Sequence, residues 1–368
     1  MKLVLPAALA LSCALSFATS AQAPPKRQIV NIGGGSDRDA QTADWPKPAA
    51  REGMSDADRV SSVEAVVAAM AARDLFSGVV LVAKDGKPLL RKAWGLASRE
   101  YGVSNRPDTR FNIGSIDKTF TAAAIRLLAK DGKLSLDDVV AKHLPDYKGP
   151  AADRITIRQL LEHTSGMGDI FTPVGMKTPR VMIRKLDDFL PAFEEAPLKF
   201  EPGKGREYSN AGYVLLGLIV EKESGKPFDE FYRERIFLPL GMTETGALEA
   251  DAIVPNRATG YTRRAPRGPF AEPHANTLLR PAKPSSAGGG DSTADDLLRF
   301  GEAGRRDALG LGLKGHAMGI AGGMPGANAV LEVCANGITI VTLSNVDPPS
   351  AEYVADHARE LFGCAPVH

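Results

Sequence analysis

Two β-hairpin patterns, one near each end of the chain, constrain the fold more than any other feature. In GVVLVAKDGKPLLRKAWG, two β-rich runs flank Asp85-Gly86, a dipeptide typical of tight hairpin turns. In NAVLEVCANGITIVTLSN, the turn falls at Asn336-Gly337. The patterns between the hairpins are mostly helical. We therefore expect an α/β fold in which the N- and C-terminal segments form one antiparallel β-sheet flanked by helices, with a mostly helical subdomain of approximately residues 120–310 inserted beside a cleft.

Helices are expected to pack near both ends of this sheet. Ser55 is a candidate N-cap for a helix that runs to about Ala72. Its apolar residues recur at helical spacing at Val60, Val63, Val66, Val67 and Met70. A last helix is expected from Ser350 to about Phe362. One folded domain is therefore predicted over residues 55–365.

The N-terminal segment has the order of a secretory signal peptide. Lys2 precedes a long, almost wholly apolar run that ends in small residues. We expect residues 1–23 to be the leader and the mature protein to be secreted or periplasmic, with no membrane span after the leader. Cleavage after Ala21 is the alternative to cleavage after Ala23. Lipid attachment at Cys13 is the alternative to an ordinary leader.

Residues 24–54 are rich in Pro, Gly, Asp and Ala and have little hydrophobic periodicity, so a flexible lead-in is expected there. Removal of the leader takes Cys13 with it and leaves Cys334 and Cys364. In an oxidising compartment these two cysteines would pair as a disulfide. Two separately buried thiols account for the sequence equally well.

The charge balance limits the class of partner. The chain has 45 Lys and Arg against 44 Asp and Glu, a formal net charge of +1, without long single-sign runs. This balance argues against nucleic acid and anionic membranes and favours a small-molecule partner. The six histidines show no metal-ligand spacing, so neither a metal nor another cofactor is expected. Nothing in the pattern indicates the oligomeric state.

A serine and a lysine three residues apart stand at the start of a predicted helix in FNIGSIDKTFTAAAIRLLAKDG. Three residues of helix place Ser115 and Lys118 on one face, about 4.5 Å apart along the axis. A serine hydroxyl attacks a carbonyl only when a base takes its proton, and lysine serves as that base only where burial or nearby positive charge lowers its pKa. The pair therefore indicates nucleophilic catalysis, although Ser-x-x-Lys alone also arises from a helix cap and an exposed lysine.

Two further motifs accompany this pair. Tyr208, Ser209 and Asn210 stand directly before a strongly apolar helix, and GIAGGMPGANA precedes the C-terminal hairpin. Taken separately, Asn210 would cap the helix and the glycines would form a turn. In this order and at these distances, the three motifs resemble the serine β-lactamase and penicillin-binding protein superfamily. The likeness is to its class C β-lactamase-like branch, which includes family VIII esterases and D-amino acid peptidases.

Other stretches support the resemblance over nearly the whole chain after the lead-in. They are LLEHTSGM, FEPGKGREYSN, IFLPLGM and SAGGGDSTADDLLRF. The resemblance implies that Ser115 attacks the substrate carbonyl and carries the acyl group, while Lys118 takes its proton. Tyr208, as a phenolate favoured by Lys118, would be a general base in acylation or in activating water. Asn210 would hydrogen-bond Lys118 or the substrate amide.

The third motif implies the oxyanion site and also departs from the family pattern. The oxyanion would lie between the backbone amides of Ser115 and Gly323, with Gly322 allowing the edge strand to approach closely. The family normally begins this motif with Lys or His, but the aligned residue here is Ile320. That cation commonly binds the carboxylate of a β-lactam or of a peptide C-terminus. His316 would be its only nearby substitute.

We therefore expect an exported serine hydrolase that forms an acyl-enzyme on Ser115, most readily with small carboxylic esters. The alternatives are a β-lactamase or D-amino acid peptidase or carboxypeptidase, and a catalytically weak binding or scaffold protein that uses the same cleft. His163 would suit a Ser-His-Asp hydrolase, but no G-x-S-x-G sequence accompanies it, and the resemblance makes it a structural residue near the cleft. The physiological substrate stays open.

Overall fold

The computed structural model describes residues 41–47, 53–172, 178–264, 271–309 and 317–364. The predicted signal peptide, residues 1–23, and His316 lie outside these residues. Within them, no helix combines the length and the apolar character that crossing a bilayer requires.

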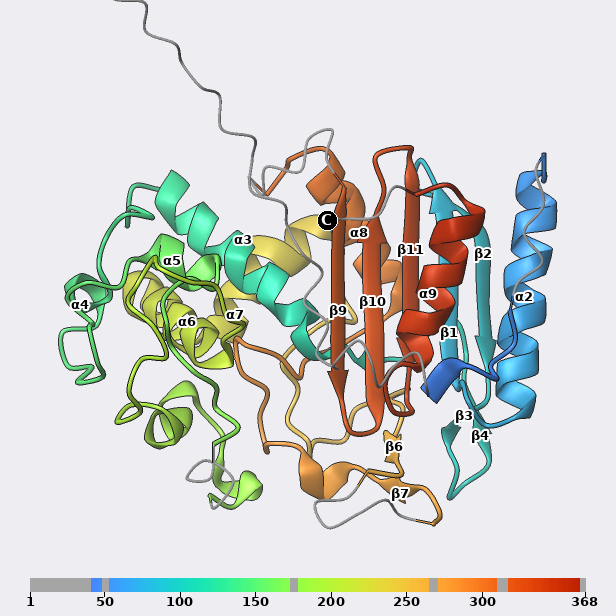
Figure 1. The fold of residues 1–368 in the computed structure, drawn as a ribbon, viewed down its shortest axis with the longest axis horizontal. Coiled ribbons are helices and arrows are strands. Elements are labelled where there is room, and N and C mark those ends of the chain that lie inside the picture. Colours follow the sequence, from blue (N-terminus) through green and yellow to red (C-terminus); the bar gives the residue numbers. More distant parts are fainter. Residues whose placement is uncertain (1–40, 48–52, 173–177, 265–270, 310–316, 365–368) are drawn as a thin grey trace, which may run out of the picture.

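The expected antiparallel sheet forms from both ends of the chain, which confirms the predicted α/β fold (Figure 1). Its five strands lie in the order β2-β1-β11-β10-β9. Their bounds are Gly78–Lys84 for β1, Lys87–Trp94 for β2, Met318–Met324 for β9, Ala327–Val333 for β10 and Ile338–Ser344 for β11. The two predicted hairpins meet where β1 pairs with β11, in a register from Gly78 opposite Ser344 to Lys84 opposite Ile338. The glycine-rich third motif supplies the edge strand β9.

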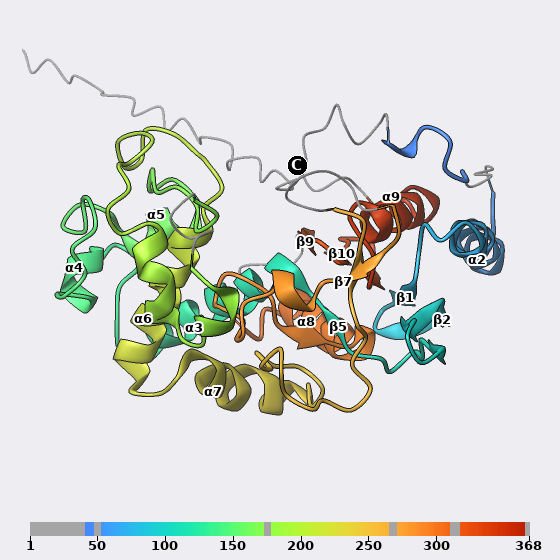
Figure 2. The same cartoon turned by 90° about the horizontal axis from the view of Figure 1, so that it is seen from below.

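The sheet is covered on both faces because its side chains alternate between two apolar clusters. Val80 and Val82 of β1 face the cluster with α2 (Asp56–Ala72) and α9 (Ser350–Leu361), and Figure 2 shows both helices on one side of the sheet. Val79 and Leu81 face the cluster that includes α8 (Ala294–Arg305). The bounds of α2 and α9 confirm the two predicted helices, and Ser55 caps α2 through a reciprocal pair of hydrogen bonds with Asp58.

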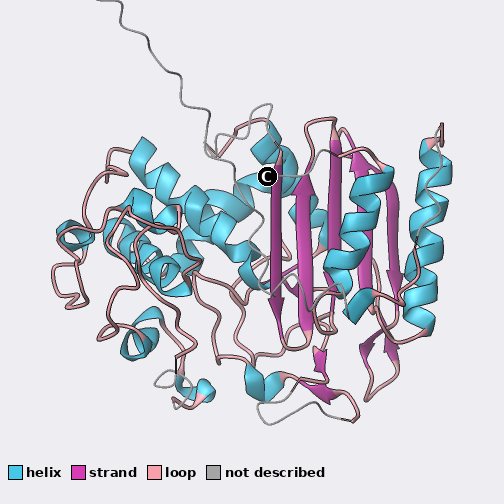
Figure 3. Cartoon of the chain, viewed as in Figure 1, coloured by secondary structure: helices cyan, strands magenta, loops and turns pink. Residues whose placement is uncertain are grey.

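The helices that do not cover the sheet lie together beside β9 (Figure 3). They are α3 (Asp117–Lys130), α4 (Val140–His143), α5 (Ile157–Leu161), α6 (Asn210–Ser224) and α7 (Phe228–Tyr232). Helix α6 is buried along most of its length and packs against α3, α5 and α7. Phe120 of α3 joins this region to α8, because its ring meets Phe300 edge to face at 4.8 Å. The sheet and the helical region therefore share one core.

Short elements connect these layers. The two-stranded pairs are β3 (Leu96–Ser98) with β4 (Val103–Ser104), β5 (Phe111–Asn112) with β8 (Asp291–Ser292), and β6 (Tyr261–Thr262) with β7 (His274–Ala275). The 3₁₀ turns are η1 (Gly114–Ile116), η3 (Arg180–Met182), η4 (Leu186–Ala192), η6 (Leu238–Leu240) and η7 (Thr277–Leu279), and η5 (Arg233–Phe237) is a π-helical turn.

Part of the expected lead-in packs on the folded body. Trp45 is 8% exposed, and its ring meets Tyr353 of α9 edge to face at 4.9 Å. Asp44 forms an ion pair with Arg73 at 2.6 Å. Burial of a tryptophan outweighs the cost of ordering a short stretch. The expectation of a flexible lead-in over 24–54 is therefore wrong for residues 41–47.

Cys334 and Cys364 form a disulfide, which decides between the two alternatives left open by the sequence. Their sequence separation is 30 residues, and the bond joins the segment after β10 to the end of α9. Closing such a loop stabilises the fold by about 3–4 kcal/mol through the entropy of the unfolded chain.

Loss of the disulfide is therefore expected to lower the free energy of unfolding by about that amount. Urea unfolding of the double variant Cys334→Ala/Cys364→Ala, compared with the wild type, measures the effect. Wild-type protein with a reductant is the matched control, because it keeps both side chains. Equal stability of oxidised and reduced wild type would contradict the prediction.

Candidate active site

The structure brings Ser115 and Lys118 together as the sequence predicted, with Lys118 Nζ 3.2 Å from Ser115 Oγ. Their side chains belong to different elements. Ser115 lies in the 3₁₀ turn η1, and α3 begins only at Asp117, so the expectation of a helix that starts at Ser115 is wrong by two residues. Gly114, with φ of 51°, makes the bend that precedes the serine.

A glycine-rich loop holds this turn in place. Asn112 accepts a hydrogen bond from the Gly114 N–H at 3.0 Å and donates one to the Gly289 carbonyl at 2.6 Å. The Gly290 N–H donates to Asp117 at 2.6 Å. Burial raises the pKa of this Asp117 carboxyl to about 7. The loop therefore fixes both sides of the turn that presents Ser115.

Lys118 is almost fully enclosed, with 3% of its surface exposed. Besides Ser115, its Nζ faces Asn210 Oδ1 at 2.7 Å and the Ala287 carbonyl oxygen. Burial lowers the pKa of this amine to about 7, while the nearby carboxylates Asp169 and Asp117 partly oppose that effect. A neutral amine is therefore available near neutral pH, as base catalysis requires.

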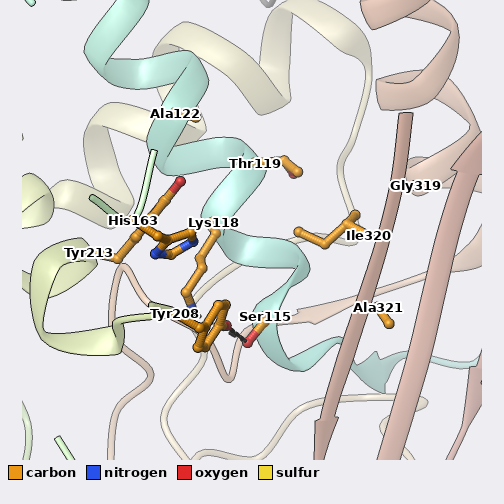
Figure 4. A pocket seen from close by; sticks show the side chains of 10 residues that line it. All are labelled: Ser115, Lys118, Thr119, Ala122, His163, Tyr208, Tyr213, Gly319, Ile320 and Ala321. Atoms are coloured by element: carbon orange, nitrogen blue, oxygen red, sulfur yellow. Dashed lines mark hydrogen bonds between the residues drawn. The ribbon is translucent and has the colours of Figure 1, made fainter. Parts of the chain in front are cut away.

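Tyr208 completes the group around the serine. Its hydroxyl donates to Ser115 Oγ at 2.7 Å (Figure 4). Burial raises the pKa of this phenol above its usual value, and only the hydrogen bond with Ser115 opposes the shift. The expectation of a phenolate favoured by Lys118 is therefore wrong for this state, in which Tyr208 is a neutral hydrogen-bond donor.

Asn210 lies at the start of α6, but it does not cap the helix. Ser209 is the N-cap, because its Oγ accepts the Gly212 N–H at 3.0 Å. Asn210 is thus free to turn its amide oxygen to Lys118 and its amide nitrogen to Asp169. The alternative that Asn210 is merely a cap is not supported.

His163 lies behind Tyr208 as a packing residue. Its ring centroid is 4.8 Å from that of Tyr208 and 5.1 Å from that of Tyr213. Its Nδ1 faces the Ser209 N–H at 3.2 Å, and burial lowers the pKa of the imidazole to about 3. The neutral ring therefore accepts a backbone hydrogen bond, and no hydrogen bond joins it to Ser115 among the described residues.

The edge strand β9 runs directly against the serine turn. A Cβ added to Gly322 would lie 2.1 Å from the Ile113 carbonyl oxygen and 2.7 Å from the Ser115 nitrogen. A Cβ on Gly114 would lie 2.7 Å from the Gly323 nitrogen. The structure thus places both glycines of the third motif beside the turn that carries Ser115.

A cavity of about 150 Å³ opens beside these groups. Its lining is Ser115, Lys118, Thr119, Ala122, His163, Tyr208, Tyr213, Gly319, Ile320 and Ala321. Figure 4 shows Ile320 projecting from β9 toward α3. Lys118 lies on the opposite wall, where it also approaches the Tyr208 ring at 4.8 Å. The cavity therefore has a polar end at the serine and an apolar wall on β9.

Several residues of the site were not identified from the sequence. Thr119 and Ala122 follow Ser115 at spacings of four and seven residues, so an extension of the helical pattern would have found them. Asp169 and the Ala287 carbonyl come from loops, and Tyr213 belongs to the apolar pattern of α6. For these three the sequence carries no comparable signal.

The chain resembles known proteins over most of its length. Residues 63–320 match the protein family described as Beta-lactamase. Esterase EstB from Burkholderia gladioli is 32% identical over 298 residues, which are 68% of this chain and 75% of the esterase. Putative penicillin-binding protein PbpX from Bacillus subtilis (strain 168) is 33% identical over 186 residues, or 50% of this chain. That match covers 45% of PbpX, so the aligned part is less than half of this relative.

A solved structure supports the same relationship. The penicillin-binding protein from Bacillus halodurans aligns with a TM-score of 0.71 at 29% identity. The alignment covers 80% of this chain and 99% of that protein.

Proposed function

This chain belongs to the Beta-lactamase family, within the superfamily of serine β-lactamases and penicillin-binding proteins, and on that premise we propose that it is a serine hydrolase acting through an acyl-enzyme on Ser115. Small carboxylic esters are the class of substrate that the chemistry of the site favours. One observation carries the proposal: Ser115 Oγ lies 3.2 Å from a buried amine and 2.7 Å from a phenol, at the polar end of a cavity.

The proton positions follow from the partners of Lys118. A neutral amine has two N–H donors and one lone pair. Asn210 Oδ1 and the Ala287 carbonyl accept the two hydrogens, so the lone pair is left for the Ser115 hydroxyl proton. Tyr208 donates to the same oxygen. Ser115 Oγ then bonds to the substrate carbonyl carbon as its proton passes to Lys118.

Tyr208 acts in the steps that follow. Once Oγ is bonded to the carbonyl carbon, the Tyr208 hydroxyl protonates the alkoxide as the bond between that carbon and the alkoxide oxygen breaks, because an alkoxide is much more basic than a phenolate. The protonated Lys118 amine, close to the Tyr208 ring, then stabilises the phenolate. This phenolate takes a proton from the water whose oxygen attacks the acyl carbon. The bond between that carbon and Ser115 Oγ then breaks, and protonated Lys118 returns its proton to Oγ. The predicted phenolate is thus proposed for the acyl-enzyme and not for the resting protein.

The oxyanion is proposed to bind between the Ser115 and Gly323 backbone N–H groups. Ser115 is the second residue of η1, and the first N–H groups of a helix have no acceptor within it. The contact of β9 with the turn at Gly322 supports the placement of the second donor. Such a donor typically contributes about 3 kcal/mol to transition-state stabilisation.

The wall opposite Lys118 supports an uncharged acyl group. Ile320 stands where related proteins have a cation, and it lines the cavity beside Gly319 and Ala321. A substrate carboxylate there would lose its water without gaining a partner. The similarity to an esterase agrees with this preference. Action on β-lactams or D-amino acid peptides is the second candidate, because the Ser115 and Lys118 geometry serves any acyl transfer.

A fluorophosphonate probe, a panel of esters and a chromogenic cephalosporin test the proposal. We expect covalent labelling of Ser115 and ester turnover well above cephalosporin turnover. Folded protein that is not labelled would support a binding or scaffold role. Cephalosporin hydrolysis as fast as ester hydrolysis would reverse the proposed substrate preference.

Introduction of the missing cation gives a sharper test of specificity. Ile320→Lys is expected to raise kcat/KM for a carboxylate-bearing ester, relative to its uncharged analogue, by about tenfold, the effect of about 1.4 kcal/mol. Ile320→Met is the matched control, because it keeps a long apolar side chain. An unchanged ratio of the two kcat/KM values in Ile320→Lys would show that this wall does not contact the acyl group.

The pH profile of the wild type tests the candidate base. Only neutral Lys118 can accept the Ser115 proton, and burial lowers the pKa of this lysine to about 7. We therefore expect kcat/KM for an uncharged ester to rise with pH, to reach half its maximum near pH 7 and to level off above it. A lysine with an unperturbed pKa would place this midpoint at about pH 10.4. A midpoint in that range would exclude Lys118 as described.

Export of the mature chain is also proposed. The leader-like order of residues 1–23 supports it, and so does the disulfide, because such bonds persist mainly in oxidising compartments. The intact mass of protein recovered from the periplasm or medium tests the proposal and identifies the cleavage site. Full-length mass with recovery only from the cytoplasm would contradict it.

A further inference from the structure

Asp169 is a charged residue beside the site to which the preceding mechanism gives no part. It lies two residues after the HTSGM stretch and is partly buried. Both of its carboxylate oxygens accept from the same nitrogen, Asn210 Nδ2, at 3.0 and 2.9 Å. The other end of that amide, Oδ1, accepts from Lys118 Nζ at 2.7 Å. Asp169 and Lys118 are therefore joined by a single side-chain amide.

This arrangement allows only one orientation of the Asn210 amide. A carboxylate accepts hydrogen bonds and donates none, so the NH₂ group must face Asp169. The carbonyl oxygen must then face Lys118. In the reverse orientation, the amide nitrogen would point at the amine donors and its oxygen at the carboxylate, and both contacts would be repulsive. Ser209, which caps α6, already fixes the backbone on which this amide is carried.

Asp169 is also one of the two carboxylates whose negative charge acts on the Lys118 amine. The other carboxylate that acts on the amine is Asp117, whose pKa burial raises to about 7, so it is partly protonated near neutral pH. Among the residues that the structure describes, two phenols and an imidazole also pack around Lys118. They are Tyr208, Tyr213 and His163. The pKa shifts of Tyr208 and His163 leave both uncharged.

We propose that Asp169 is a positioning residue, which orients the Asn210 amide and, through that amide and its own charge, holds Lys118 as the base that faces Ser115. The inference rests on the proposed function. Asp169 does not line the cavity, and its carboxylate accepts from Asn210, so its effect on Ser115 passes through its neighbours.

Two variants separate this role from simple structural support. Asp169→Asn removes the charge but keeps an oxygen that can accept from Asn210. The exchange Asp169→Asn/Asn210→Asp keeps one amide and one carboxylate but places the carboxylate directly against Lys118. Asp137→Asn is the matched control, because Asp137 is an exposed aspartate paired with Arg158 on the surface. Each protein is followed by the rate of Ser115 labelling with a fluorophosphonate between pH 5 and 9, and by ester kcat/KM.

The two variants are expected to move the profile in opposite directions. Loss of a negative charge makes the amine easier to deprotonate, so Asp169→Asn should lower the midpoint of labelling by about half a pH unit or more. A carboxylate in direct contact favours the ammonium, so the exchange variant should raise the midpoint by about one unit or more. Mere loss of structural support would lower the rates without such opposite shifts.

Coincident midpoints for the wild type and both variants would overturn the inference and leave the proposed function intact. Absence of labelling in the folded wild type at every pH would instead overturn the proposed function, and this inference with it. Equal shifts in Asp137→Asn would also count against the inference, because they would reflect a general effect of net charge.

Discussion

Replacement of Ser115 by alanine is expected to lower kcat for the best ester by a factor on the order of 10³ or more. The variant keeps the cavity, the apolar wall and the candidate oxyanion donors, but it has no oxygen that can form the acyl-enzyme. Fluorophosphonate labelling should disappear completely. Steady-state kinetics and intact mass after exposure to the probe measure the two effects.

The fold of this variant is expected to remain intact. Ser115 Oγ forms hydrogen bonds with Lys118 and Tyr208, and each buried polar group left without a partner costs about 1–3 kcal/mol. Water entering the cavity replaces part of that loss. Ser61→Ala, which removes an exposed hydroxyl from α2, is the matched control and should retain full activity. Ester turnover above a tenth of the wild-type rate in folded Ser115→Ala would refute the acyl-enzyme on this residue.

The sheet was predictable because the turn residues of its hairpins can be identified in the sequence itself. Asp85 and Gly86 both have positive φ, at 50° and 75°, which is the backbone that an Asp-Gly hairpin turn requires. The capped start of α2 at Ser55 is similarly local. Packing of Trp45 on Tyr353 was not predictable, because a single tryptophan followed by Pro46 has no periodicity that points to a distant helix.

The site was predictable only where side chains belong to one short motif. Ser115 and Lys118 are brought together by local helical geometry, so their spacing alone predicts their contact. Asp169 reaches Lys118 through Asn210, and Ala287 contributes only a backbone carbonyl, which any residue could supply. The charge state of Tyr208 depends on burial, which no motif records.

Substitution of Gly322 by alanine is expected to give the second large loss of activity, because the site has no room for a side chain there. The φ of Gly322 lies outside the left-handed region, so alanine can adopt the same backbone conformation. The added methyl group would lie 2.1 Å from the Ile113 carbonyl oxygen. That oxygen belongs to the backbone, so no flexible side chain can move aside to relieve the contact. Strand β9 must therefore move away from η1.

Gly322→Ala is consequently expected to lower kcat/KM by about 10² or more, because a displacement of about 1 Å removes the Gly323 N–H from the oxyanion position. The midpoint of thermal unfolding should also fall. Gly246→Ala is the matched control: its added Cβ would meet only the Leu248 side chain, at an ordinary 3.4 Å. If Gly322→Ala instead keeps wild-type kcat/KM and stability, the edge strand does not press on the serine turn, and the oxyanion must be bound elsewhere. If stability falls while kcat/KM is retained, the contact is structural and Gly323 is not an oxyanion donor.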